Sequence, residues 1–240
     1  MTTTTDAAEA TTAFVAARAE LLARPRTSGA HSRRALGALT DEWLRRLFTL
    51  AGGPATGAAL VAVGGHGRGE LAPGSDLDLL LLHPPGEDVT ALADRLWYPV
   101  WDAGLRLDHS VRTVPQARRL AADDIKVVLG ILDARTVAGD AALGEGLRSS
   151  VLADWRGFAR DRLPQLREDV LARAERAGEL AHLLEPDLKE AYGGLRDTTV
   201  LRAVAASWVT DIPHETLVAP HTRLLDVRDA LHLTTGRAAD

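Results

Sequence analysis

Asp76 and Asp78, separated by one leucine, are the residues of this sequence best placed to do chemistry. They open a leucine-rich run, 76–82, that predicts a strand, in which residues i and i+2 point to the same face about 6.6–6.8 Å apart. Two carboxylates aimed at one spot repel each other unless a cation lies between them, and Mg²⁺ prefers carboxylates together with substrate phosphates. A solvated acidic strand edge is the alternative. The position at the end of an apolar strand favours a metal site that activates an attacking hydroxyl.

A glycine-rich segment, 64–69, precedes this pair and directly follows an apolar run, 59–63, that predicts a buried strand. Gly64 and Gly65 would let backbone N–H groups approach a triphosphate with no Cβ atom in the way. The segment is not a Walker A loop, because it contains no Gly-Lys-Ser/Thr. It is not a Rossmann fingerprint either, because a second acidic strand stands where a helix is expected. A plain turn is the alternative.

Three side chains near these motifs have two interpretations each. Arg68 would pair a phosphate, or only its neighbour Glu70. Ser75 would contact a phosphate, or serve as a turn residue before the strand. Asp108, in a third expected strand, would face the same side as the aspartate pair and act as a third carboxylate, or lie on the surface as an ordinary acid.

A second group of candidates lies far downstream, around Lys189 and Arg196. A helical domain facing the cleft would offer one of these cations to a triphosphate through charge-assisted contacts. Gly193 and Gly194, just before an expected helix, would present free N–H groups at its N-terminus. The alternative is a tight loop with a surface pair between Arg196 and Asp197.

The elements that must position these residues divide the chain into three parts. We expect a polar tail and helix at 1–30, a small α/β unit at 31–145 and an incomplete helical domain at 146–240. Nearly everything after Pro115 reads as helical. The periodicity predicts helices at 13–23 (ending near Pro25), 34–51, 88–103 (kinked or ended at Pro99) and 220–233, and strands at 59–63, 76–82 and 105–111.

Composition excludes several classes of protein. The 240 residues are 46% hydrophobic and 25% charged, carry a formal net charge of −5 and contain no cysteine. Disulfides, thiolate metal sites and a cysteine nucleophile are therefore excluded, and a reducing compartment is compatible. The negative charge argues against bulk binding to nucleic acid or anionic membranes. Without a signal peptide or a long apolar segment, the sequence predicts a cytoplasmic location and no membrane or nucleic-acid partner.

The order strand, Gly-Gly, Asp-x-Asp and a later strand with a lone acid resembles the polymerase-β-like nucleotidyltransferases. The string at 64–80 more specifically resembles the bacterial PII uridylyltransferase family. Residues 96–102 and 109–113 are similar to other parts of that family's nucleotidyltransferase domain, and 184–197 to its following helical domain. The resemblance spans about residues 40 to 230. It implies an α+β fold, in which a small mixed sheet with helices is followed by a helical domain.

The resemblance also implies an activity: Mg²⁺-dependent transfer of UMP or AMP, from UTP or ATP, to a tyrosine of the nitrogen-signalling protein PII. Asp76, Asp78 and Asp108 would be the catalytic metal ligands, and the nucleotide-binding set would be Gly64, Gly65, Arg68, Ser75, Lys189 and Arg196. Removal of the nucleotide is not expected from this chain, because it contains no His-Asp motif of the phosphohydrolase kind.

Two other functions remain open from the sequence. A glutamine synthetase adenylyltransferase shares the fold and a related Gly-Gly-Leu/Ile-Arg-Asp/Glu string, although residues 67–75 favour PII modification. A truncated module that binds PII without modifying it is the other alternative. The retained acid pair argues against such a module. No residue distinguishes UTP from ATP.

Overall fold

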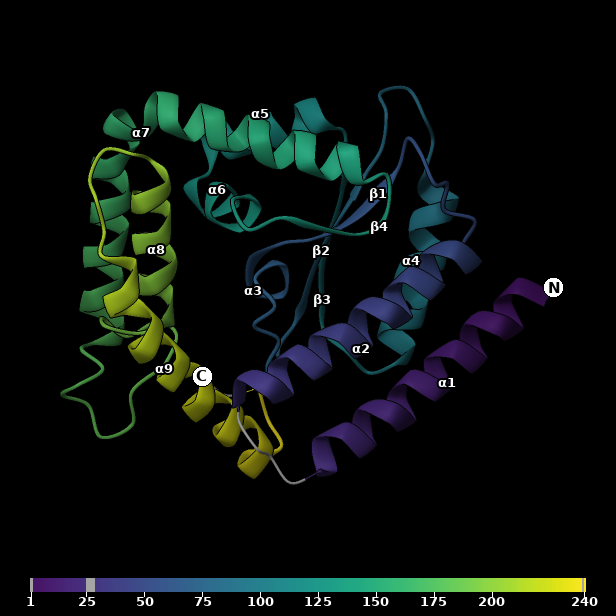
Figure 1. The fold of residues 1–240 in the computed structure, drawn as a ribbon, viewed down its shortest axis with the longest axis horizontal. Helices are drawn as coiled ribbons and strands as arrows, with labels where there is room; N and C mark the ends of the chain where they lie inside the picture. The colour runs from purple at the N-terminus through teal and green to yellow at the C-terminus, as the bar shows by residue number, and fades with distance from the viewer. Residues whose placement is uncertain (1, 25–28, 239) are drawn as a thin grey trace.

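A small mixed sheet lies at the centre of the computed structural model, which describes residues 2–24, 29–238 and 240 (Figure 1). Its strands are β1 (Ala59–Ala62), β2 (Leu77–Leu82), β3 (Leu107–Arg112) and β4 (Arg135–Gly139), in the order β3-β2-β1-β4. β1 is antiparallel to β2 and β4, whereas β2 and β3 are parallel. The parallel pair needs a crossover, which contains α4 (Thr90–Asp102). The expected α+β class and mixed sheet are confirmed.

The two faces of the sheet bury separate cores, because side chains along a strand alternate. Leu77, Leu79 and Leu81 of β2 join a core with residues of α4 and of two long N-terminal helices, α1 (Thr2–Ala23) and α2 (Gly29–Leu50). Leu80 and Leu82 join the opposite core, built with α5 (Val114–Asp123), α6 (Ile125–Ile131) and α7 (Ala141–Ala177). By the same alternation, Asp78 lies on the face that α5, α6 and α7 cover.

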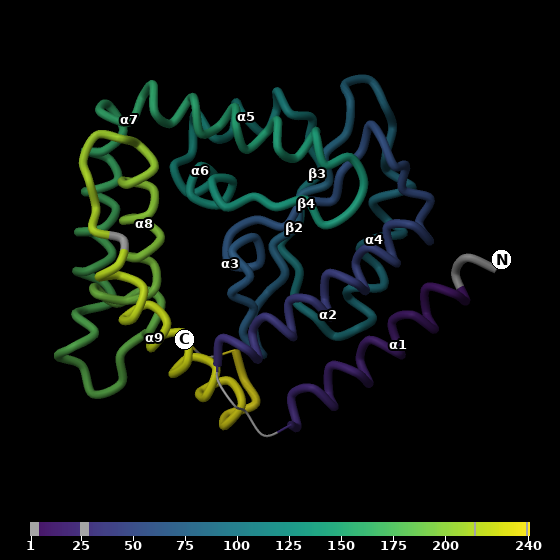
Figure 2. Tube along the Cα trace, viewed as in Figure 1, coloured from purple at the N-terminus to yellow at the C-terminus, as the bar shows by residue number. Residues whose placement is uncertain are grey.

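The C-terminal helices fold back toward the start of the sheet unit. α8 (Leu195–Ala206) packs on α7, where the Trp155 indole N–H donates to the carbonyl of Ala203 at 2.8 Å. α9 (His214–Thr235) then runs to the first turns of α2, as the yellow end of the trace shows (Figure 2). There the guanidinium of Arg33 pairs with Asp226 at 2.8 Å and with Asp229 at 2.7 Å. Residues far apart in the sequence therefore meet around the β1–β2 connection.

The structure corrects three details of the sequence interpretation. Residues 2–12 belong to α1 and are not a frayed tail; Phe14 of this helix stacks on Trp43 with ring centroids 4.0 Å apart. The expectation that nearly everything after Pro115 is helical left out one strand, β4. α4 does not end at Pro99, and α9 begins at His214 and not at Pro220.

Other expectations stay open. Pro25, the predicted helix end, lies outside the described residues. The boundaries 1–30, 31–145 and 146–240 stay predictions, and α7 crosses the last of them as one helix. Across the described ranges, no helix combines the length and the hydropathy needed to span a bilayer.

Candidate active site

Gly64 brings the backbone of the glycine-rich segment against the first carboxylate of the site. The one-turn helix α3 (Gly64–Gly67) follows β1, and the Val63 N–H donates to the carbonyl of Asp78 at 3.0 Å. Gly64 has φ +54, and a Cβ atom placed on it would lie 2.9 Å from Oδ2 of Asp78. Only glycine satisfies both the backbone conformation and this neighbour. A Cβ on Gly65 would have Arg68 Nη2 as its nearest neighbour at 3.9 Å, so space remains at this position.

The predicted carboxylates lie within electrostatic reach of one another. Asp78 is paired with Asp108 in the parallel register of β2 and β3, so both side chains project from the same face. Burial raises the pKa of the Asp78 carboxyl, and the charges of Asp108 and Asp76 raise this pKa further. Lys189 and His66 oppose that rise. The ionised form of Asp78 is thus energetically unfavourable, and a nearby cation would stabilise it.

Asp76 is turned toward a cation of the protein. Its Oδ1 lies 2.5 Å from Nε of Arg106, and the same guanidinium donates to the carbonyl of Gly74 at 3.1 Å. Both partners are largely solvent-exposed. Such a pair is weak, so it leaves Asp76 available to a competing ligand.

The chemistry of the carboxylates suits a divalent cation, although the described side chains do not form a complete set of metal ligands. No group of three or more His, Cys, Asp or Glu residues in the described ranges is gathered closely enough to hold a metal ion. Burial and the charges of Asp108 and Asp76 raise the pKa of Asp78, and this fits a cation nearby because hard oxygen ligands suit Mg²⁺. Asp76 would have to leave Arg106 to join such a ligand set.

The structure gives Arg68 and Ser75 partners within the protein. The guanidinium of Arg68 pairs with Glu70 at 2.6 Å and with Asp133 at 2.9 Å. Ser75 Oγ accepts from the backbone N–H of Ala72 at 3.0 Å, which closes the turn before β2. These are the structural alternatives that the sequence left open for both residues, and neither contact involves the carboxylates of the site.

Of the two downstream cations, Lys189 reaches the site and Arg196 is held elsewhere. The charge of Lys189 lowers the pKa of Asp78, and its Nζ lies 3.7 Å from a carboxylate oxygen of Asp240. Arg196 donates two hydrogen bonds to Oε1 of Glu190, at 2.6 and 3.2 Å. Gly194 directly precedes α8, as expected, but the N–H groups of Gly193 and Gly194 are not free. They donate to Oδ2 of Asp197 at 2.6 Å and to the carbonyl of Ala191 at 2.8 Å.

Two buried polar groups near the site were missed by sequence reasoning. One joins His66 of α3 to Asp41 of α2 and Arg135 of β4. Asp41 falls on the buried stripe of α2, together with Gly37 and Leu44, and a carboxylate in that stripe was the signal that could have revealed it.

The other missed group centres on Glu70. Its carboxylate accepts hydrogen bonds from Arg68 and from His221 of α9, the latter at 2.8 Å, and it pairs with Arg202 of α8 at 3.2 Å. Burial alone would raise the pKa of Glu70, but the hydrogen bond from His221 and the charge of Arg68 outweigh it and lower this pKa to about 2. This cluster ties the loop after α3 to the helical part of the chain.

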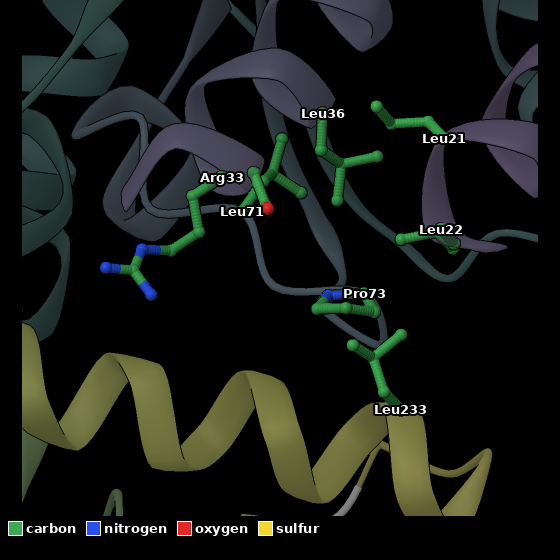
Figure 3. Close-up of a pocket in the computed structure, with 8 residues that line it drawn as sticks. Leu21, Leu22, Arg33, Leu36, Leu71, Pro73 and Leu233 are labelled. Carbon is green, nitrogen blue, oxygen red and sulfur yellow. The ribbon is translucent and has the colours of Figure 1, made fainter. Parts of the chain in front are cut away.

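A small and mostly apolar pocket lies apart from these carboxylates. It is formed where α1, α2, the β1–β2 connection and α9 meet (Figure 3). The residues that line it include none of the candidate site residues; they are Leu21, Leu22, Ser32, Arg33, Leu36, Leu71, Pro73 and Leu233. Apart from Ser32 and Arg33, its lining side chains are apolar, and Arg33 is already paired with Asp226 and Asp229.

Comparison with known proteins agrees with this geometry. Residues 44–128 match the model of the nucleotidyltransferase domain family, a span that contains α3, β2 and β3. The chain is 63% identical, over 95% of its length, to the bifunctional uridylyltransferase/uridylyl-removing enzyme of Streptomyces coelicolor. It is 47% identical over 78% of its length to the protein of that name from Mycobacterium tuberculosis, and 37% identical over 95% to that from Burkholderia thailandensis.

These alignments cover only part of each relative. The chain spans about a quarter of the length of the curated relatives it matches: 27%, 24% and 28% of the three proteins. With its nucleotidyltransferase domain and this identity along nearly the whole chain, the protein belongs to the family of the bifunctional uridylyltransferase/uridylyl-removing enzymes.

Proposed function

We propose that this chain transfers UMP from UTP, or AMP from ATP, to a tyrosine hydroxyl of the signalling protein PII. The observation that carries the proposal is the placement of Gly64 against Asp78, with Asp108 in register beside it. A backbone turn that can approach phosphates thus adjoins acids that repel one another. The family membership supports a uridylyl group as the one transferred.

The reaction is an in-line displacement at the α-phosphorus of the nucleotide. The phenol oxygen of the acceptor forms a bond to that phosphorus while the bond to the leaving pyrophosphate breaks, and the phenol proton passes to a base. The exposed carboxylate of Asp108 is available for that role. The α3 turn would hold the phosphates, and Lys189, whose charge acts on Asp78, would add positive charge.

Asp76, Asp78 and Asp108 would hold Mg²⁺. When bound, the ion supplies positive charge that stabilises the attacking and leaving oxygens of the transfer. A bound ion would favour the ionised form of Asp78, whose pKa is raised by burial and by the neighbouring charges of Asp108 and Asp76. The proposal places the reaction in the cytoplasm, in keeping with a chain that lacks cysteine.

The test is to incubate the protein with PII, Mg²⁺ and labelled UTP or labelled ATP, and to follow label onto PII. We expect transfer, and the better of the two nucleotides identifies the donor. Asp76→Asn and Asp78→Asn should each reduce transfer by at least 10²-fold with the fold retained, as expected when a charged group that acts in the transition state is removed.

A matched control is Asp154→Asn. Asp154 pairs with Arg118 on the surface, so its loss changes one charge and one exposed ion pair away from the site. This variant should keep full transfer. Absence of transfer with both nucleotides from folded protein would overturn the proposal in favour of a PII-binding module. Label on glutamine synthetase in place of PII would favour the adenylyltransferase alternative.

A further inference from the structure

A largely buried hydrogen-bonded group anchors α3 to α2 and β4. The imidazole of His66, in the middle of α3, is completely buried, and its Nε2 lies 2.9 Å from Oδ1 of Asp41. Burial alone would raise the pKa of Asp41, but hydrogen bonds from His66 and Arg135 outweigh it and hold this pKa below its usual value. Asp41 is therefore a charged, paired acid inside the protein.

Arg135 completes the group and extends it to the backbone of α3. Its guanidinium donates to both oxygens of Asp41, at 2.6 and 3.2 Å, in the forked geometry that arginine favours with carboxylates. The same guanidinium reaches the carbonyl oxygens of His66 and Gly67, each at 3.4 Å. Arg135 thus contacts both the side chain that anchors the turn and the turn itself.

α3 cannot shift without disturbing the site. A Cβ on Gly67 would lie 2.3 Å from the carbonyl oxygen of Asp133, so one side of the turn already presses on the connection before β4. Its other end, Gly64, abuts Asp78. Any movement of His66 would therefore move the Gly64 and Gly65 amides and the carboxylate together.

We propose that Asp41, His66 and Arg135 form a positioning network that sets the α3 turn at the depth needed to bind the nucleotide triphosphate. The three residues act through the turn and do not touch the substrate themselves. A transfer site needs its phosphate-binding groups held within about 0.5 Å of the productive geometry, which a four-residue helix with three glycines cannot ensure alone. The inference rests on the proposed binding of nucleotide at Gly64 and Gly65.

The experiment measures the dissociation constants of Mg-UTP and Mg-ATP by calorimetry on the full 240-residue chain, at a temperature well below each variant's unfolding midpoint. We expect Asp41→Asn and Arg135→Met each to weaken nucleotide binding by about tenfold, because each removes a charge-assisted contact within one network. The double variant should be little weaker than either single one, as expected for residues that act together. Arg135→Lys keeps the charge but loses the fork, so it should restore only part of the affinity.

Arg33→Met is the matched control. Arg33 also lies on α2 and forms a buried ion pair, but with α9 and eight residues away from Asp41. It should lower the unfolding midpoint without changing nucleotide affinity. Arg135 is the more exposed partner, so its variants remain informative should Asp41→Asn fail to fold.

Three results would overturn the network. Unchanged affinity in folded Arg135→Met is one, an equal loss in Arg33→Met is the second, and full additivity in the double variant is the third. Failure of the unaltered protein to bind either nucleotide would instead count against the proposed function, so the two failures are distinguishable.

Discussion

Gly64 and Asp78 are in such close contact that a single methyl group cannot be placed between them: a Cβ on Gly64 would lie 2.9 Å from Oδ2 of Asp78. This contact joins the first residue of α3 to the face of β2 that carries the acids. It explains why a glycine stands at position 64, two residues after the end of β1, where the backbone is also left-handed at φ +54. The turn and the carboxylate form one unit, and changes at either residue should act on both.

Gly64→Ala should impair both stability and nucleotide binding. The left-handed backbone costs a non-glycine residue about 1–2 kcal/mol, and the added methyl must displace the Asp78 carboxylate. Gly65→Ala has no such clash, so it should fold normally but weaken nucleotide binding by crowding the phosphates. Urea unfolding and calorimetric titration with Mg-UTP measure the two effects separately.

Gly130→Ala is the control for this pair of variants. Gly130 lies in α6 with open space around its Cβ position and an ordinary helical backbone, so alanine should be neutral or slightly stabilising there. Normal stability in Gly64→Ala would show that the turn tolerates a side chain. That outcome would contradict the tight contact with Asp78.

Asp78→Asn should stabilise the protein while abolishing transfer. A carboxyl whose folded pKa is raised is destabilising wherever it is ionised, and this penalty disappears as the pH falls toward the unfolded value of about 3.9. In buffer without divalent cations at pH 7, we expect a gain of about 0.5–2 kcal/mol, in the range of other substitutions that relieve unfavourable charge. Urea unfolding at pH 7 and at pH 4 checks the sign, since the gain should shrink at the lower pH.

The control for this prediction is again Asp154→Asn. The Asp154 carboxylate is paired with Arg118, so this substitution should leave the stability of the protein unchanged or lower it, and should not raise it. A loss of stability in Asp78→Asn at pH 7 would mean that burial and the charges of Asp108 and Asp76 do not destabilise ionised Asp78 in solution.

Glu70 should make a pH-dependent contribution to stability of the opposite sign. Its pKa is lowered to about 2, so its stabilisation is present above the unfolded value of about 4.3 and is lost as the pH falls through 2. The shift corresponds to about 3 kcal/mol at neutral pH for this largely buried side chain. Glu70→Gln should therefore be strongly destabilised at pH 7, and its difference from the unaltered protein should narrow between pH 4.5 and pH 2.

Chemical denaturation across that pH range measures the difference. Glu42→Gln is a suitable control, because Glu42 pairs with Arg45 on the exposed face of α2. It should change stability by less than about 1 kcal/mol at every pH. If the difference in stability between Glu70→Gln and the unaltered protein did not change with pH, the pKa of Glu70 in the folded protein would be close to its unfolded value.

The alternation of polar and apolar residues along the sequence was enough to predict the strands in which it is regular. The alternating residues 76–79, of which β2 includes all but Asp76, and the alternation of β3 predicted both strands and placed Asp78 and Asp108 on one face. β4 was missed because its five residues, Arg135–Gly139, alternate weakly and lie between helices. Its strand state comes from pairing with β1, a contact that sequence spacing does not reveal.

The candidate site was predictable where it depends on local chemistry and not where it depends on tertiary partners. The Gly64 turn and the acids could be read from spacing. The pairing of Arg68 with Asp133, and of Glu70 with His221 of α9, could not, because those partners lie 65 and 151 residues away. Likewise, Lys189 and Arg196 look alike in sequence, and only the fold brings the first near Asp78.

Arg106 should compete with Mg²⁺ for Asp76, because its guanidinium lies 2.5 Å from Oδ1 of that carboxylate. The pair is exposed, and pairs of this kind contribute about 0.2–1 kcal/mol, so Arg106→Ala should lower the Mg²⁺ concentration for half-maximal transfer by at most about fivefold. Stability should hardly change. Transfer assayed over a Mg²⁺ series at saturating nucleotide measures the midpoint, and Arg112→Ala, at the far end of β3, controls for the lost positive charge. A higher Mg²⁺ requirement in Arg106→Ala would mean that Arg106 assists nucleotide binding and does not occupy the place of the ion.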